Sequence, residues 1–191
     1  MLTDALQFLV QTLLGLVATA FWLRFYLQWA RVPFHHPFAQ IIVRVTNFAV
    51  KPLRRIVPGL LGMDWSSLLP FLFIEIIAVT LIEMIGDYPF TVAGTSVLSG
   101  LLLLGMAAAL KLVLQTFILL IIGQAILSWV SPVSPASALF HALTAPILNP
   151  LRRVIPPITG IDLSPIAAFI LIQLVLMLPV ALLEQSARAL M

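Results

Sequence analysis

Four apolar stretches, each long enough to cross a bilayer as a helix, constrain this chain more than any other feature. A hydrocarbon core about 30 Å thick needs roughly 20 helical residues. The predicted spans cover residues 5–30, 67–85, 97–130 and 165–184. Only 9% of the 191 residues are charged, and 62% are hydrophobic, which is too few charges for a soluble surface. We therefore predict an all-α membrane protein with four transmembrane helices.

The third span is longer than a bilayer requires. Residues 97–130 form about 51 Å of straight helix. They are either one long helix with a bend near Gly100 to Gly105, or a span preceded by a separate interfacial helix. We favour the long helix. Aromatic residues near the span ends predict a belt at the headgroup level, and this belt consists of Trp22, Tyr26, Trp29, Trp65 and Trp129.

Basic residues collect in two of the loops. The first loop holds Arg31, Arg44, Lys51, Arg54 and Arg55, and the loop after the third span holds Arg152 and Arg153. The loop between the second and third spans has no base. The positive-inside rule then places both basic loops in the cytoplasm and both termini outside, in the periplasm if the membrane is a bacterial inner membrane. Because topology explains the net charge of +3, we expect no nucleic-acid partner.

The two basic loops share a motif. Pro52-Leu53-Arg54-Arg55-Ile56-Val57-Pro58 aligns with Pro150-Leu151-Arg152-Arg153-Val154-Ile155-Pro156. The match continues through Asp64 and Ser66 onto Asp162 and Ser164. We predict two parallel repeats, residues 1–87 and 88–191, each a helix, a basic loop and a helix.

The motif also predicts local structure. Prolines on both sides of Leu-Arg-Arg should isolate a short stiff element, because proline disrupts a helix interior. Ser164, followed by Pro165, should be the N-cap of the last span. Residues 38–51 have the pattern of an amphipathic helix that lies in the headgroup plane. Its polar face contains Gln40, Arg44, Asn47 and Lys51. The second loop lacks this basic face, and Pro146 should interrupt its helix.

Two polar positions fall inside the predicted membrane. Glu75 lies near the midplane, within reach of Arg24, and the second repeat has Gln173 and Gln124 at these positions. We expect one polar pair per repeat, Arg24 with Glu75 and Gln124 with Gln173. Intramembrane acids are candidates for ion or proton pathways. The alternative, favoured by the neutral second pair, is polar adhesion between helices.

The candidate binding residues are the bases of the two loops. They have three interpretations: topology determinants, ligands of anionic lipids, or a docking site for a protein partner. These residues are Arg44, Lys51, Arg54, Arg55, Arg152 and Arg153. The histidines, His35, His36 and His141, all lie in the loops, and there is no cysteine. We expect neither a metal site nor a cofactor, and no catalytic motif is present, so we do not expect an enzyme.

The second copy of the motif resembles the YggT family, also called YlmG, in its two-repeat proteobacterial form. The residues that carry the resemblance are Asn149-Pro150-Leu151-Arg152-Arg153-Val154-Ile155-Pro156-Pro157, Gly160-Ile161-Asp162-Leu163-Ser164-Pro165 and Gln173. The first copy departs from the pattern, with Lys51, Gly59, Ser67 and Glu75 at four of these positions. The resemblance implies a role in the cell envelope, in osmotic tolerance or cell division. A plastid relative is linked with haem attachment to a b-type cytochrome.

The resulting hypothesis is a non-enzymatic membrane scaffold or assembly factor. Its basic loops would hold anionic lipid or an unidentified membrane or cytoplasmic protein. Two alternatives stay open. One is a channel or transporter with Glu75 and Arg24 in its pathway. Four spans form a thin bundle, so a pore would require a homo-oligomer. The other is a haem or cytochrome assembly factor, which rests on the family resemblance alone.

Overall fold

The structure is a computed structural model that describes residues 1–32, 36–57, 63–86, 88, 96–155 and 162–191. Its helices are α1 (Leu2–Trp29), α2 (Pro37–Leu53), α3 (Trp65–Ile85), α4 (Val97–Val130), α5 (Pro135–Val154), α6 (Ser164–Val175) and α7 (Ala181–Leu190). A π-helical turn, Leu176–Val180, joins α6 to α7 without a break. Four segments are long and apolar enough to cross a membrane: α1, α3, α4 and the continuous α6–α7. The chain is therefore a multi-pass membrane protein, as predicted.

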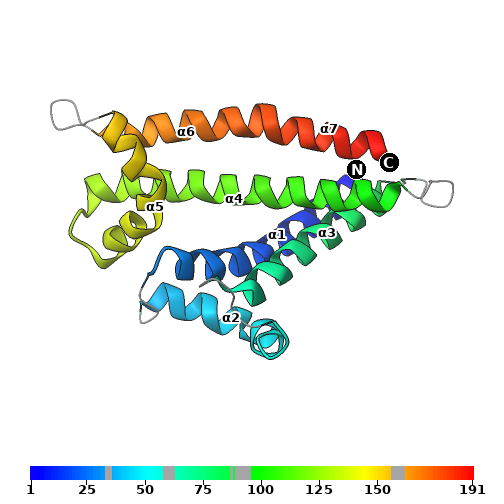
Figure 1. The fold of residues 1–191 in the computed structure, drawn as a ribbon, viewed down its shortest axis with the longest axis horizontal. Coiled ribbons are helices and arrows are strands. Elements are labelled where there is room, and N and C mark those ends of the chain that lie inside the picture. The colour runs from blue at the N-terminus through cyan, green and yellow to red at the C-terminus, as the bar shows by residue number, and fades with distance from the viewer. Residues whose placement is uncertain (33–35, 58–62, 87, 89–95, 156–161) are drawn as a thin grey trace.

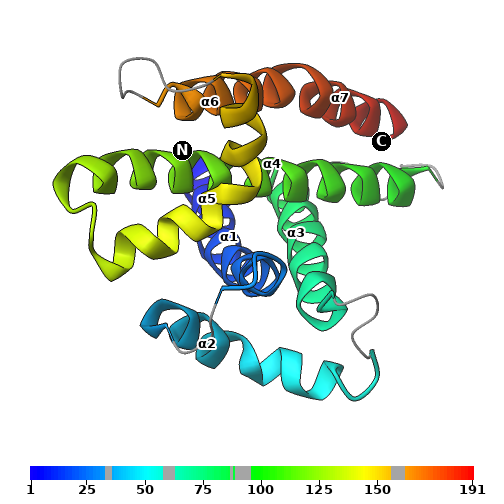
Figure 2. The same cartoon turned by 60° about the vertical axis from the view of Figure 1, so that its left-hand side comes forward.

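The two termini lie at the same end of the molecule, and α2 and α5 lie at the other end (Figure 1). We call these the terminal end, with Met1 and Met191, and the basic end, with the bases of the two predicted loops. Helix α1 packs along α3, and α4 lies at the centre, in contact with α3, α5, α6 and α7. Figure 2 shows α2 lying across the ends of α1 and α3. Both repeats thus run in the same direction.

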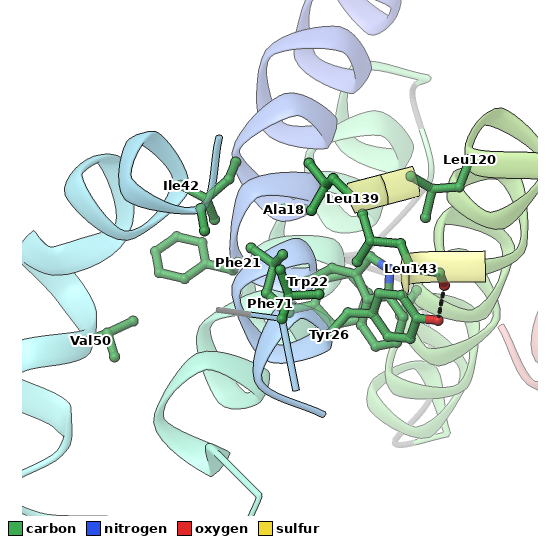
Figure 3. Packing of buried hydrophobic residues seen from close by; sticks show 14 residues of the cluster. Ala18, Phe21, Trp22, Tyr26, Ile42, Val50, Phe71, Leu120, Leu139 and Leu143 are labelled. Carbon is green, nitrogen blue, oxygen red and sulfur yellow. Dashed lines mark hydrogen bonds between the residues drawn. The ribbon is translucent and has the colours of Figure 1, made fainter. Parts of the chain in front are cut away.

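Aromatic side chains of α1 contribute to the contact between the repeats, beside the packing of α3 on α4 (Figure 3). The Trp22 ring stacks on Tyr26, and both meet Phe117 of α4 edge-on. The Tyr26 hydroxyl donates to the Leu143 carbonyl of α5. Trp22 and Tyr26 are only 8% and 1% exposed, so neither ring faces the lipid. Their flat, amphipathic rings fill the interface between the repeats instead.

Helix α4 is one continuous helix of 34 residues, which confirms the favoured sequence-based alternative. Its glycines allow neighbouring helices to approach. A Cβ on Gly105 would lie 2.6 Å from Ile76 Cγ1 of α3, and a Cβ on Gly100 would lie 2.9 Å from the Ala187 carbonyl of α7. Small residues at such crossings are typical of helix packing in membranes.

The first proline of each motif, Pro52 or Pro150, lies inside a helix, which corrects the prediction of an isolated stiff element. Helix α2 includes Pro52, and α5 continues through both Pro146 and Pro150. Proline bends a helix without ending it when packing holds both halves. Leu143 and Leu148, on either side of Pro146, are both fully buried. Pro58 and Pro156 lie outside the described residues.

Candidate functional site at the basic end

In each repeat, the first arginine of the motif is tied to an aspartate ten residues later. Arg54 forms an ion pair with Asp64, in which Nε is 3.4 Å from Oδ1 and Nη2 contacts Oδ2. Arg152 Nε lies 2.8 Å from Asp162 Oδ2. Both aspartates come just before a membrane-spanning helix. The equivalent pairs therefore fix the end of each loop to the start of the following span.

The same aspartates organise the first turn of that span. Asp64 Oδ2 accepts a hydrogen bond from the Ser67 hydroxyl at 2.9 Å, and Asp162 Oδ1 accepts one from the Ser164 backbone N–H at 2.9 Å. Ser164 is the first residue of α6, so the prediction that its side chain caps the helix is wrong. Asp162, two residues earlier, supplies the accepting oxygen, because its carboxylate carries a charge that favours the helix N-terminus.

The Asp162 carboxyl has a lowered pKa. Partial burial raises this pKa, but the hydrogen bonds from the Ser164 backbone and from Arg152 outweigh the effect, so the pKa lies below the ordinary value of 3.8. Asp162 is therefore ionised at neutral pH and holds Arg152 as a charged pair.

The second arginine of each motif is free. Arg55 and Arg153 are exposed, and neither makes an ion pair with any residue that the structure describes. The same is true of Arg44 and Lys51 in α2. We call Arg44, Lys51, Arg55 and Arg153 the free bases. The sequence suggested equal roles for the two arginines of each motif, whereas the structure divides them into one paired and one free.

Arg24 does not meet Glu75, its predicted partner. The Arg24 side chain is buried at the basic end, where Nη1 donates to Thr46 Oγ1 at 2.8 Å and to Asn47 Oδ1 at 3.0 Å. Its Nε lies 4.0 Å from Asp64 Oδ2. Helix α2 crosses the end of α1 and brings these oxygens to the guanidinium, so the hydrogen bonds of Arg24 are made with α2 rather than with Glu75.

The amide pair predicted for the second repeat does not form a hydrogen bond either. Gln124 is buried, and its Oε1 has no hydrogen-bond partner in the described part of the chain. Gln173 lies on α6 and is half-buried. The repeats agree instead at Thr46 and Thr144, which are both fully buried and donate to the carbonyl four residues earlier, at 2.7 and 2.9 Å.

The first repeat encloses a basic cavity of about 870 Å³. Three arginines and one aspartate supply its charges, so the lining carries an excess of positive charge. The lining residues are Arg24, Arg44, Arg54, Asp64, Gln28, Gln40, Val43 and Asn47. Guanidinium and amide groups in this arrangement suit an anion that carries oxygens, such as a phosphate. The sequence-based prediction did not include Arg24 in this site. Its position near the end of the first span could have indicated that it lies close to the basic loop.

The histidines have local contacts in the described part of the basic end. His36 Nδ1 accepts a hydrogen bond from the Phe38 backbone N–H at 3.3 Å and so caps α2. His141 Nε2 lies 3.5 Å from Arg152 Nη1. Within the described residues, no group of three His, Cys, Asp or Glu side chains is placed to hold a metal ion. His35 lies outside these residues.

Two helix–loop–helix repeats in parallel, each closed by an arginine–aspartate pair, define a class of small two-repeat membrane proteins. The CCB3/YggT family model matches residues 3–85 and 103–183, one match in each repeat. The chain belongs to the CCB3/YggT family.

Three relatives from proteobacteria are similar along almost their whole length. An uncharacterised protein of Pseudomonas aeruginosa is 38% identical over 179 residues, which cover 93% of this chain and 89% of the relative. One from Vibrio alginolyticus, described by its position in the proC 3′ region, is 35% identical over 89% of this chain and 90% of its own. The uncharacterised YggT of Escherichia coli K12 is 33% identical over 90% of this chain and 87% of its own. No solved structure matches the chain.

Proposed function

We propose that this chain is a non-enzymatic scaffold or assembly factor of the bacterial inner membrane, with a role in envelope homeostasis that includes osmotic tolerance and division. The basic end faces the cytoplasm, and both termini face the periplasm. At the basic end, the free bases and the basic cavity bind the phosphate headgroups of anionic lipids. A lipid-bound surface of this kind would position a membrane or cytoplasmic protein.

The division between paired and free arginines carries this proposal. Arg54 and Arg152 each form an ion pair with an aspartate. A base that serves only to set the topology can be paired in this way. Arg55 and Arg153 keep an exposed, uncompensated charge. Each such base near an anionic surface contributes about 1 kcal/mol to binding.

The surface of α2 supports a position in the headgroup plane. Ile41, Val45 and Phe48 are exposed apolar side chains on this helix. Arg44 and Lys51 are exposed on the same helix. Exposed apolar groups beside exposed bases are what a helix needs to lie at the boundary between acyl chains and anionic headgroups.

The chemistry of the basic cavity favours binding over catalysis. Its polar lining consists of guanidinium, amide and carboxylate groups. Among the described lining residues, no hydroxyl or thiol stands beside a base that would activate it as a nucleophile. Such a site holds an anion and does not transform it.

The test compares two double variants that have the same net charge. In Arg55→Gln/Arg153→Gln, the free arginines are lost, and in Arg54→Gln/Arg152→Gln the paired ones are lost. Native mass spectrometry of protein in mixed-lipid micelles would measure retained phosphatidylglycerol against phosphatidylcholine. We expect the free-arginine variant to lose part of the preference for the anionic lipid, because Arg44, Lys51 and the basic cavity remain, while its thermal stability stays unchanged. We expect the paired-arginine variant to lose stability.

Equal lipid retention in the wild type and the free-arginine variant would contradict lipid binding by these residues. Photo-crosslinking in cells, from Leu151 and Val154 in the last turn of α5, adds a second readout. If a protein is captured reproducibly and its capture depends on Arg153 but not on anionic lipid, the site docks a protein rather than a lipid.

A further inference from the structure

A second cavity, of about 680 Å³, lies between the two repeats. It extends from Glu83 and Arg188 at the terminal end to Phe38 and Phe140 on α2 and α5. Helices of both repeats form its wall, namely α1 and α3 from the first and α4 and α7 from the second. In many secondary transporters built from repeats, sites for substrates and coupling ions lie at the interface between the repeats.

The charges that line this cavity do not balance. Three acids and two bases line it, and both bases are paired: Lys111 Nζ lies 3.1 Å from Glu184 Oε1, and Arg188 Nη1 lies 3.2 Å from Glu83 Oε1. The fifth charged side chain, Glu75, is 7% exposed and forms neither an ion pair nor a hydrogen bond with any described residue. When ionised, Glu75 gives the lining a net charge of one negative unit.

Hydroxyl oxygens with free lone pairs line the same cavity. Thr19 Oγ1 donates its proton to the Gly15 carbonyl at 2.7 Å, and Thr116 Oγ1 donates to the Leu112 carbonyl at 2.8 Å. A hydroxyl that has donated its proton offers only its oxygen lone pairs to another ligand. Toward the cavity, both threonine oxygens can therefore act only as hydrogen-bond acceptors or cation ligands, as a carboxylate does.

Glu75 and Thr19 lie at a similar depth between the ends of the molecule. The Phe71 ring centroid is 5.8 Å from that of Trp22. Glu75 is one helical turn beyond Phe71, and Thr19 is about one turn from Trp22. Both steps lead toward the terminal end, because α1 and α3 run in opposite directions (Figure 1). Glu75 and Thr19 are therefore both displaced by about one helical turn, in the same direction, from the contact between Trp22 and Phe71.

We propose that Glu75 is the anionic ligand of a site for one small monovalent cation, in the cavity between the repeats. A buried carboxyl within the membrane either takes up a proton or, when it stays ionised, needs a compensating positive charge, and one monovalent cation balances the single negative charge of the ionised lining. Carboxylate and hydroxyl oxygens are the ligands that hard cations prefer. Gln173 occupies the position of Glu75 in the second repeat, so the second repeat offers no carboxylate at the equivalent position. The site is independent of lipid binding at the basic end.

The test uses N,N′-dicyclohexylcarbodiimide, an apolar reagent that modifies accessible carboxyls within membranes. The full-length protein in liposomes is treated in NaCl or in choline chloride at equal ionic strength, and the modified residue is identified by mass spectrometry. We expect modification at Glu75 in choline, and at least a several-fold slower reaction in NaCl because Na⁺ occupies the carboxylate. Glu75→Gln should abolish the modification.

Two further variants separate a cation site from a structural role. Thr19→Val keeps the carboxyl and the helix but removes one oxygen, so Glu75 should still react while protection by Na⁺ weakens. Asp4→Asn, which removes an exposed acid outside the cavity, should keep full protection. Modification at the same rate in NaCl and choline chloride would overturn the proposal, and so would failure of Glu75 to react in the folded wild type.

Discussion

At the scale of single residues, Asp162 shows how one carboxylate serves two purposes. It pairs with Arg152 at the end of the loop and accepts the Ser164 backbone N–H at the start of α6. Asp64 holds Arg54 in the same way and lies near Arg24 as well. The loss of either aspartate would break its ion pair with the arginine and would also weaken the start of the following span.

The lowered pKa of Asp162 predicts how the second loop responds to acid. A carboxyl whose folded pKa lies below its unfolded value stabilises the fold fully above the unfolded pKa, about 3.9. That stabilisation is lost as the pH falls through the folded pKa. We expect the protection of the Ser164 amide, measured as its hydrogen-exchange rate relative to the intrinsic rate at each pH, to fall between pH 5 and acid values below about 3.

The matched variant for this experiment is Asp162→Asn, which has no titrating group at this position. Its Ser164 amide should exchange faster than the wild type at neutral pH and show no further loss of protection in acid. Equal protection in the wild type at neutral and acid pH would contradict the assigned role of the carboxylate.

At the scale of helices, the crossing of α3 and α4 depends on Gly105. An added Cβ would lie 2.6 Å from Ile76 Cγ1 and 3.0 Å from Ile76 Cα, so the backbone of α3 would have to move. We expect Gly105→Ala to destabilise the protein by about 1–3 kcal/mol, the range of overpacked cores. Unfolding in mixed SDS micelles would measure this change.

Gly15 provides the control for this substitution. It also lies within a membrane-spanning helix, but a Cβ there would meet nothing within 4 Å. Gly15→Ala should therefore be neutral or stabilise the protein by up to about 1 kcal/mol, because alanine favours the helix. If the two substitutions changed the stability equally, close packing at Gly105 could not be the cause of the destabilisation.

The helices could be predicted from the sequence much better than the contacts of their polar groups. Span lengths and the repeat follow from hydropathy and the duplicated motif, which are local properties. The partner of Arg24 depends on how α2 crosses the end of α1, and no pattern within either helix encodes that crossing. The continuity of α5 through Pro146 depends likewise on the burial of Leu143 and Leu148 by other helices.

At the scale of the whole molecule, the two repeats form one interdependent structure. Trp22 and Tyr26 of the first repeat pack on Phe117 of the second, and Arg188 of α7 pairs with Glu83 of α3. Each aromatic pair contributes about 0.5–1.5 kcal/mol beyond its buried area. Neither half could keep these contacts by itself.

We therefore expect residues 1–88 and 89–191, expressed separately, to be degraded rapidly, and expressed together to form a stable pair. Pulse-chase labelling would measure the lifetimes. Trp22→Ala in the first half should reduce the recovery of the pair, whereas Trp129→Ala, a change at an exposed tryptophan of the second half, should not. Long lifetimes for each half alone would contradict the interdependence of the repeats.

The unequal lengths of the spans have a consequence for the bilayer. Helix α3, with 21 residues, is about 32 Å long, close to the thickness of the hydrocarbon core, whereas α4, with 34, is about 51 Å long. Tilting cannot hide so large a mismatch, so several turns of α4 must project into water or headgroups. At the terminal end its Gly100 packs against Ala187 of α7. The two helices would thus emerge from the bilayer together, packed against each other at the terminal end.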